Sequence, residues 1–367
     1  MKYFILFLSF CILLILSVDG KTTEFGCRDE NNVIVDWYYM YKLPKDSTHK
    51  GTKTKSDGLD YVYITANTVD DDSWIESQLK IDDVNSMPGR TITQIYQNAD
   101  NVALMYNDEP PTTKVDNLKG HTKGVMASDA RTGFWLVHSV PHFPPNIEDG
   151  EYGYPATGHL YGQSFLCITM NSEEVNKAGE QLLYNEPHIY SSQAPENLEN
   201  LLPNLFKAIN NETIKMAPFW NEQEFSSLQN TVFRSFAKTR HFGKDLYEDW
   251  LAPALKTDLV VETWQHGTGN MPSNCTLMNK VMNVDEIEIS AASYDFPTLK
   301  DHSKWAVSAS DDSNWICVGD INRQEHQKQR GGGTVCQNHK KMSKFYRNLV
   351  KDVEPCPKEK SQILVIF

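Results

Sequence analysis

HTKGVMASDARTGFWLVHSV (121–140) and DHSKWAVSASDDSNWICVGD (301–320) are two copies of one pattern, and they decide the fold of this chain. Each copy has a His-x-Lys tripeptide, a short apolar run, an Asp-containing turn, and then Trp with further apolar residues. Trp135 follows His121 by 14 residues, and Trp315 follows His302 by 13. Two equivalent half-sites in one chain indicate a single active centre at the junction of duplicated halves.

The spacing within each tripeptide suggests chemistry on an anionic substrate. In an extended strand, residues i and i+2 point to the same face, so His121 lies beside Lys123 and His302 beside Lys304. An imidazole can attack or protonate, and an ammonium can neutralise negative charge next to it. One His-x-Lys is usually a solvated strand edge, but two copies 181 residues apart in matching contexts favour catalysis.

Paired histidines could instead bind zinc. No Cys-x-x-Cys or His-x-x-x-His spacing accompanies these two. We therefore expect no metal and no other cofactor.

Residues 1–20 read as a secretory signal peptide, with Lys2, an apolar run from Phe4 to Leu16, and small or polar residues before Gly20. That run is shorter than the roughly 20 residues of a spanning helix, and no later stretch is long enough, so we expect no membrane span. Cys11 leaves with this peptide, and the six remaining cysteines predict three disulfides in an oxidising compartment. Asn211 and Asn274 begin glycosylation sequons; the second has Cys275 at its middle position.

Length and charge bound the organisation and the working conditions. About 347 mature residues suit two packed halves, which we place at 21–185 and 186–367. The net charge of −13 argues against a general nucleic-acid binder at neutral pH, because such proteins are normally basic. Protonation of the 11 histidines and part of the 48 carboxylates would remove most of this charge. An acidic compartment would therefore reconcile the protein with a polyanionic substrate.

Strand and helix patterns occur in both halves, which predicts an α/β or mixed α+β fold. We expect strands at 33–43, 61–66, 91–96 and 102–106, a hairpin at 121–140, and helices at 172–183, 201–209, 222–238 and 342–353.

Ten motifs are spread along nearly the whole mature chain: VDWYYMYKLP (35–44), MYNDEPP (105–111), GHTKGV (120–125), GFWLVHSVPHFPP (133–145), YGQSFLC (161–167), FRSFAK (233–238), PSNC (272–275), DHSKW (301–305), CVGDINR (317–323) and QRGGGTVC (329–336). Together they resemble the deoxyribonuclease II family, the acid, metal-independent endonucleases of the phospholipase D superfamily.

The resemblance implies a phospholipase D-like pseudo-dimer: two mixed sheets flanked by helices, with the His-Lys pairs meeting between the halves. It implies disulfides Cys27–Cys167, Cys275–Cys356 and Cys317–Cys336, where spacing alone leaves 15 pairings open. It also implies a lysosomal or secreted enzyme with DNA as substrate and no obligate protein partner.

The implied reaction is hydrolysis of DNA to 3′-phosphate and 5′-hydroxyl ends through a phosphohistidine. One of His121 and His302 attacks phosphorus, the other protonates the leaving oxygen, and Lys123 and Lys304 stabilise the non-bridging oxygens. Analogy with the wider superfamily favours His121 as nucleophile, although the sequence itself does not distinguish the two. One charged and one neutral imidazole suit an acidic optimum.

Further residues carry roles implied by the same resemblance. His138 matches a third functional histidine, with a buried strand histidine as the alternative. Asp320 and Asn322 stand where superfamily members often have polar substrate-binding residues, or they only form a turn. Gly331 to Gly333 predict a tight loop with possible phosphate contact.

The chain departs from the superfamily pattern His-x-Lys-x4-Asp, because Ser128 and Ala309 stand at the Asp positions. The departure weakens a phospholipase D-like phosphodiesterase, which is one alternative function. The other is a secreted DNA-binding protein whose catalysis has decayed. Both intact His-Lys pairs argue against that alternative.

Overall fold

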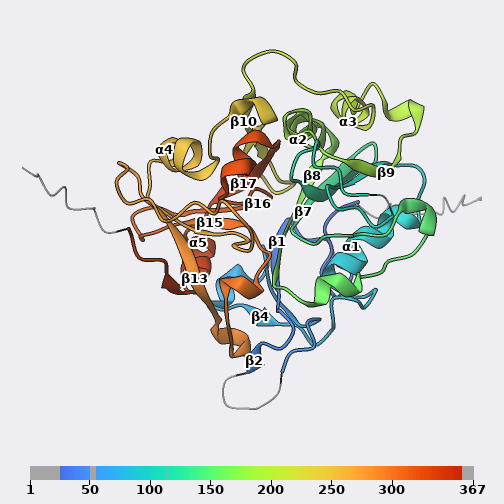
Figure 1. Cartoon of the computed structure of the whole chain (residues 1–367). Helices are drawn as coiled ribbons and strands as arrows, with labels where there is room; N and C mark the ends of the chain where they lie inside the picture. Colours follow the sequence, from blue (N-terminus) through green and yellow to red (C-terminus); the bar gives the residue numbers. More distant parts are fainter. Residues whose placement is uncertain (1–24, 50–54, 113, 358–367) are drawn as a thin grey trace, which may run out of the picture.

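The computed structural model describes residues 25–49, 55–112 and 114–357, so the expected signal peptide lies outside the described residues. Within them, two large, mostly antiparallel sheets and five α-helices confirm the mixed α/β class. The first sheet is drawn mainly in blue to green, and the second in yellow to red beside it (Figure 1).

The first sheet has eight strands in the order β4-β3-β1-β8-β7-β6-β5-β9. Their bounds in that order are Ile75–Glu76, Tyr61–Thr65, Trp37–Lys42, Gln163–Asn171, Thr132–His138, Lys123–Ser128, Val102–Asn107 and Ile189–Gln193. The first copy of the repeated sequence forms the central hairpin β6–β7. Its turn is closed by the Asp129 carboxylate, which accepts from the backbone N–H groups of Arg131 and Thr132 at 2.6 and 2.8 Å.

The second sheet has the order β10-β11-β17-β16-β15-β12-β13-β14-β2, with β18 paired to β13. The bounds are Trp220–Ser226, Val232–Lys238, Gly332–Asn338, Trp315–Gly319, Trp305–Ser308, Leu259–Glu262, Val281–Ile289, Tyr294–Pro297 and Thr48–His49, with Val350–Val353 for β18. The second copy forms the hairpin β15–β16, in the place that β6–β7 holds in the first sheet. The division of the chain at 185/186 stays a prediction; β9 joins the first sheet and β2 the second.

Five helices cover the sheets: α1 Met87–Tyr96, α2 Ser172–Asn185, α3 Pro203–Ile209, α4 Ala252–Leu255 and α5 Lys340–Arg347. One buried cluster joins both sheets through α2 and α5, as in the packing of Leu166, Leu182, Trp305 and Tyr346. A second cluster lies between the first sheet and α1, and a third between the second sheet and α4. The two sheets therefore share a central core, and the hairpins that follow the two His-x-Lys tripeptides are held in a fixed relation.

Two of the expected elements were of the wrong type, and a third is partly wrong. The β-branched stretch 91–96 lies in α1, because Ser86 accepts from Gly89 N–H at 3.2 Å as an N-cap and Pro88 suits the first turn. The expected helix 222–238 is the hairpin β10–β11, which turns after Ser226 and pairs Phe225 with Phe233. The expected helix 342–353 ends at Arg347 and is followed by β18.

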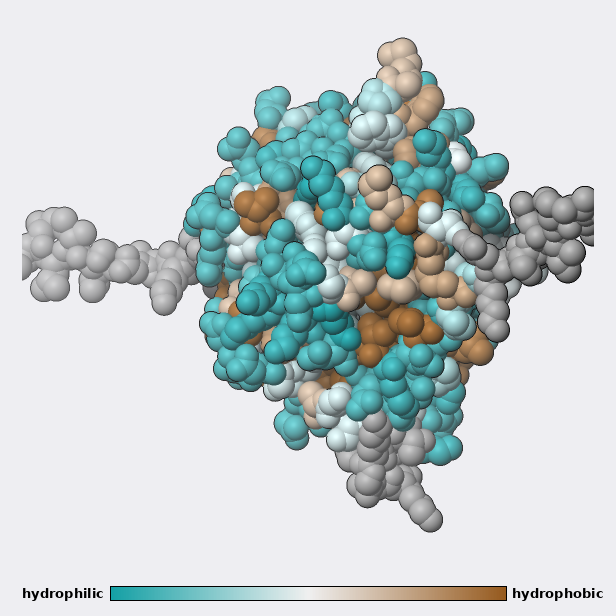
Figure 2. All heavy atoms as spheres, turned by 90° about the vertical axis from the view of Figure 1, so that its left-hand side faces the viewer, coloured by the Kyte–Doolittle hydropathy of each residue, from teal (hydrophilic) through white to brown (hydrophobic). Residues whose placement is uncertain are grey.

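Three disulfides tie distant segments together: Cys27–Cys167, Cys275–Cys356 and Cys317–Cys336. Cys317 and Cys336 face each other in β16 and β17. Among the described residues, no helix is long and apolar enough to cross a membrane. The face drawn in Figure 2 is mostly hydrophilic with a few apolar patches.

Candidate active site

The two His-x-Lys tripeptides occupy equivalent positions in the two sheets. His121 and Thr122 precede β6, and His302 and Ser303 come shortly before β15. The backbone N–H of His121 donates to the carbonyl of Gly331 at 2.9 Å, and that of His302 donates to Gly162 at 2.9 Å. Each histidine is thus anchored on a strand end of the other sheet.

Both histidines line one open cavity of about 440 Å³. Residues from both halves complete its wall: Asp108, Glu109, Val115, Asn117, Trp264, His266, Gly267, Thr268, Asn322, Gln324, His326, Gln327 and Arg330. The structure therefore brings the two histidines into a single cleft, whereas Lys123 and Lys304 are buried and do not line it.

Asp108 is the centre of charge on the His121 side. Its carboxylate accepts a short hydrogen bond from Lys123, lies 3.2 Å from Nη2 of Arg330, and lies 3.7 Å from Nε2 of His121. Glu109 adds a second carboxylate 3.6 Å from the Lys123 ammonium. Because Asp108 is almost fully buried, its two cationic partners offset the cost of removing its charge from water.

The His302 side has a different environment. Nδ1 of His302 lies 3.4 Å from the carbonyl of Ser139, and Nζ of Lys304 donates to the carbonyl of His302 at 2.5 Å. The imidazole stacks on Tyr161 and meets Trp264 edge to face, with centroid distances of 5.7 and 4.5 Å. Among the described residues, no carboxylate lies within ion-pair distance of either His302 or Lys304.

Burial controls the ionisation of these groups. It lowers the pKa of His121 well below 6.5, with further lowering by Lys123, Arg330 and Lys304. It does the same to the pKa of His302, helped by Lys304 and Lys123. Burial, together with the charge of Lys123, lowers the pKa of Lys304 to about 7. Protonation of either imidazole therefore needs an acidic medium.

The other expected site residues are placed unequally. Asn322 lines the cleft, and its buried Oδ1 has no partner among the described residues. Asp320 is buried behind it, where desolvation raises the pKa of its carboxyl although Lys123 opposes the rise. His138 lies outside the cleft: it is fully buried against Phe143 and Phe165, and its Nδ1 accepts from Val140 N–H at 3.2 Å.

Gly332 and Gly333 begin β17, and the carbonyl of Gly331 is the one that holds His121. Both sequons contain accessible residues: Asn211 is exposed and Asn274 is half-buried. Neither observation tests glycosylation or phosphate contact.

Sequence reasoning missed Asp108, Arg330, Tyr161 and Trp264. Asp108 and Trp264 follow the ends of β5 and β12, and Tyr161 and Arg330 precede β8 and β17. Loop residues next to strand ends are often functional, so their position in the sequence could have marked these four as candidates.

Asp108, Glu109 and His121 offer three possible metal-ligand atoms within 4.8 Å of one another. The ammonium of Lys123 binds both carboxylates, so a cation already occupies the space between them. This donor set does not fit a divalent metal.

A sequence model of the family described as Deoxyribonuclease II matches residues 26–356. The chain belongs to the deoxyribonuclease II family. It is 38% identical over 356 residues to Plancitoxin-1 of Acanthaster planci, which covers 95% of this chain and 97% of the relative. Deoxyribonuclease-2-alpha of Mus musculus is 37% identical, with 90% and 93% covered, and Deoxyribonuclease-2-beta of Homo sapiens is 36% identical, with 95% and 96% covered. The expected family is confirmed, and with it a deoxyribonuclease II-type nuclease.

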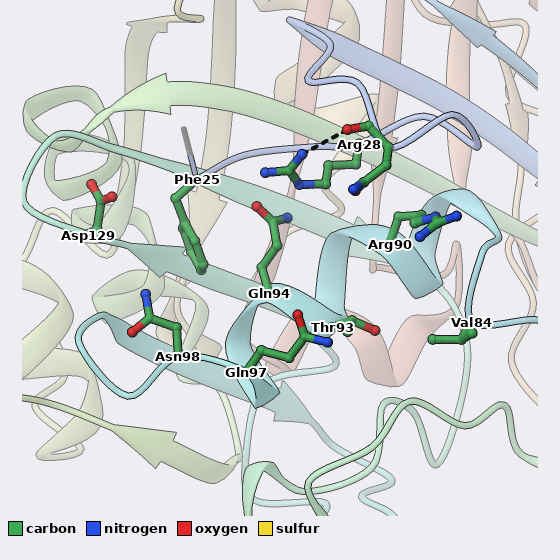
Figure 3. A pocket seen from close by; sticks show the side chains of 10 residues that line it. Phe25, Arg28, Val84, Arg90, Thr93, Gln94, Gln97, Asn98 and Asp129 are labelled. Carbon is green, nitrogen blue, oxygen red and sulfur yellow. Dashed lines mark hydrogen bonds between the residues drawn. The ribbon is translucent and has the colours of Figure 1, made fainter. Parts of the chain in front are cut away.

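A larger cavity, of about 570 Å³, lies in the first half of this deoxyribonuclease II chain, away from the histidines (Figure 3). Arg90, Thr93, Gln94 and Gln97 of α1 project around it, opposite Phe25 and Asp129. None of the candidate catalytic residues lines it, so it is distinct from the cleft.

Proposed function

We propose that the protein is an acid endodeoxyribonuclease that cleaves DNA without a metal ion, leaving 3′-phosphate and 5′-hydroxyl ends. The observation that carries this proposal is the meeting of His121 and His302, one from each half, in a single cleft, with Lys123 and Lys304 buried close to them. The four groups supply a nucleophile, a proton donor and two cations for the phosphoryl group, so no metal is needed for these tasks.

The unequal surroundings of the two histidines support a division of roles. Burial and the neighbouring cations lower the pKa of His121, but the Asp108 carboxylate 3.7 Å from its Nε2 attracts a proton to that imidazole, which suits the proton donor once the medium is acidic. At His302, an Nδ1–H pointing at the Ser139 carbonyl would leave Nε2 with its lone pair free. We therefore assign His302 as nucleophile and His121 as acid, the reverse of the assignment by superfamily analogy.

In this scheme, Nε2 of His302 forms a bond to phosphorus as the bond from phosphorus to the 5′ oxygen breaks. His121 gives its proton to that oxygen, which leaves as the 5′-hydroxyl. Neutral His121 then removes a proton from water, the water oxygen bonds to phosphorus, and the bond to His302 breaks to release the 3′-phosphate. Lys123 and Lys304 stabilise the non-bridging oxygens in both steps. Asn322 contacts the substrate from the cleft wall, Asp320 lies near Lys123, and His138 is a buried histidine of the core.

The acidic setting follows from the depressed histidine pKa values and agrees with the net charge of −13. A signal peptide and disulfides fit a lysosomal or secreted enzyme that degrades engulfed, ingested or apoptotic DNA. A relative from Caenorhabditis elegans, 35% identical over 97% of both chains, is named Cell death-related nuclease 6.

Digestion of supercoiled plasmid by the purified mature protein between pH 4 and 8, with and without excess EDTA, tests the proposal. We expect cleavage that is greatest at acidic pH, persists in EDTA, and leaves ends that a kinase labels at the 5′ position without prior phosphatase treatment. Activity that disappears in EDTA and returns with magnesium would overturn the mechanism. DNA binding without cleavage would favour the decayed binding protein, and cleavage of phospholipid head groups but not DNA would favour the other phosphodiesterase.

A further inference from the structure

Lys42, the last residue of β1, is fully buried, and no carboxylate among the described residues lies within ion-pair distance of it. Its ammonium instead donates to three backbone carbonyls of one loop: Gly158 at 2.6 Å, His159 at 3.2 Å, and Tyr161 by a shorter contact. An ammonium has three donors, so these carbonyls satisfy it fully. The loop includes a 3-10 turn at Ala156–His159 and leads into β8.

Lys238, the last residue of β11, is arranged in the same way in the second sheet. It is fully buried, and its ammonium donates to the carbonyls of Gln327 at 3.0 Å, Lys328 at 3.5 Å and Arg330 at 2.5 Å. That loop includes the 3-10 turn Glu325–Gln329 and leads into β17. Like Lys42, Lys238 has no carboxylate within ion-pair distance among the described residues.

The two lysines occupy equivalent positions in the duplicated halves. Lys42 faces Gln163 in β8, and Lys238 faces Gly332 in β17. Relative to these facing residues, the acceptor carbonyls stand five, four and two positions earlier in both loops. The same device is therefore present twice, once for each half of the site.

The residue after the third carbonyl in each loop holds the catalytic histidine of the opposite half. Gly162 accepts from His302 N–H, and Gly331 accepts from His121 N–H, both at 2.9 Å. Both anchoring glycines are tightly packed, since a Cβ on Gly162 would lie 2.4 Å from an Asp301 carboxylate oxygen and one on Gly331 would lie 2.5 Å from the Asn185 carbonyl. A small displacement of either loop would therefore move the histidine that it anchors.

Two of the residues whose carbonyls bind these lysines also contact the histidines or their neighbours through their side chains. Tyr161 stacks on the His302 ring, and Arg330 pairs with Asp108 beside His121. Each lysine thus holds a backbone anchor and a side-chain neighbour that lie in its own half, and these two residues adjoin the histidine of the opposite half.

We propose that Lys42 and Lys238 are positioning residues that act crosswise, with Lys42 fixing His302 and Lys238 fixing His121. The inference rests on the proposed function, because it needs the two histidines to have different tasks. Burial lowers the pKa of Lys42 to about 7 and that of Lys238 to about 8, so both are charged at acidic pH. The charged forms donate three hydrogen bonds each and hold the loops most firmly under those conditions.

The test compares Lys42→Met and Lys238→Met with His302→Ala and His121→Ala on two substrates. One substrate is DNA, whose 5′ oxygen needs a proton to leave. The other is thymidine 3′-(4-nitrophenyl phosphate), whose nitrophenolate leaves without one. Loss of the proton donor should slow DNA cleavage strongly and spare the first-turnover release of nitrophenolate, whereas loss of the nucleophile should abolish both.

We expect each lysine variant to slow DNA cleavage by roughly 10²-fold, the scale of a displaced catalytic group, with KM nearly unchanged. The measured quantity is the ratio of the rate of DNA cleavage to the rate of nitrophenolate release. For Lys42→Met this ratio should resemble that of His302→Ala, and for Lys238→Met it should resemble that of His121→Ala. This crosswise pairing does not depend on which histidine is the nucleophile. Lysine variants that follow the histidine of their own half, or two lysine variants that give the same ratio between the substrates, would overturn the inference.

Lys80→Met is the matched control, since Lys80 is a half-exposed lysine paired with Asp57 and Asp60 and should leave both rates unchanged. Thermal melting and near-ultraviolet circular dichroism establish that each variant is folded. If the methionine variants do not fold, Lys42→Gln and Lys238→Gln keep two donors and should give the same crosswise pattern in weaker form. Active His121→Ala and His302→Ala enzymes would refute the proposed function itself, whereas inactive histidine variants without the crosswise pattern refute only this inference.

Discussion

Lys304 donates to the backbone carbonyl of His302 at 2.5 Å, so the second His-x-Lys pair is closed on itself. In the first pair the ammonium is bound instead to the carboxylates of Asp108 and Glu109. The duplicated halves thus provide the same residue types in different electrostatic surroundings. This difference allows two chemically identical histidines to take different roles.

The pKa of Lys304, lowered to about 7, predicts the shape of the alkaline limb of the pH profile. In the proposed mechanism, Lys304 is charged below that pH and stabilises the phosphoryl oxygens, and above it the charge is lost. Because His121 must also be protonated, log(kcat/KM) should fall by about two units per pH unit above pH ~7.5. Lys304→Arg stays charged and should fall by about one unit per pH unit. A wild-type slope of about one in that range would contradict a role for the Lys304 charge.

Asp108→Asn removes the carboxylate nearest to His121. With that negative charge gone, the pKa of His121 falls further and more acid is needed to protonate it. We expect the pH optimum to move down by about one unit, with lower activity at the original optimum. The exposed Asp72, which pairs with Lys341, provides the control variant Asp72→Asn. An unchanged optimum in Asp108→Asn would exclude His121 as the acid that Asp108 supports.

His138 should make the fold sensitive to acid. Burial lowers its pKa well below 6.5, so the folded state keeps it neutral while the unfolded state binds a proton. Its contribution to stability is therefore present above pH ~6.5 and is lost as the pH falls, at up to about 1.4 kcal/mol per pH unit.

Urea unfolding of His138→Leu at several pH values between 4.5 and 7.5 should give a flatter dependence of the unfolding free energy than the wild type. His241→Leu, at an exposed position, is the control. Equal slopes for wild type and His138→Leu would show that His138 does not titrate as its burial predicts.

The Cys317–Cys336 disulfide closes a loop that contains Asp320, Asn322 and Arg330. For a sequence separation of 19, chain entropy predicts that the bond stabilises the fold by about 3 kcal/mol. The double variant Cys317→Ala/Cys336→Ala should lose about this much in chemical unfolding, and it should lose activity before it unfolds. Peptide mapping that links either cysteine to another partner would refute the pairing.

The hairpin β6–β7 could be predicted because its determinants are local. Alternating apolar residues and an Asp turn specify it within the expected range 121–140, and the same kind of sequence follows His302. The stretch 91–96 was predicted as a strand because β-branched residues favour strands. The residues that begin the helix, Ser86 and Pro88, lie outside that stretch. In 222–238, helical spacing and strand alternation were both present, and long-range pairing of β11 with β17 favoured the hairpin.

The meeting of His121 and His302 in one cleft was predictable because each half carries a complete copy of the His-x-Lys spacing. Asp108 and Arg330 were not, since they are 222 residues apart and meet only when the halves pack. The contacts of Lys42 and Lys238 could not be predicted either, because their partners are backbone carbonyls, which every residue type provides.

The shared site is tested most directly by the cleavage rates of His121→Ala, His302→Ala and the double variant on plasmid DNA at acidic pH, with folding checked by circular dichroism. If the two histidines act as a unit, each single variant should lose nearly all activity, and the double variant should be little worse than either. If the half-sites work independently, each single variant should keep about half of the wild-type rate and only the double variant should be inactive. Substantial residual activity in either single variant would contradict the single shared centre.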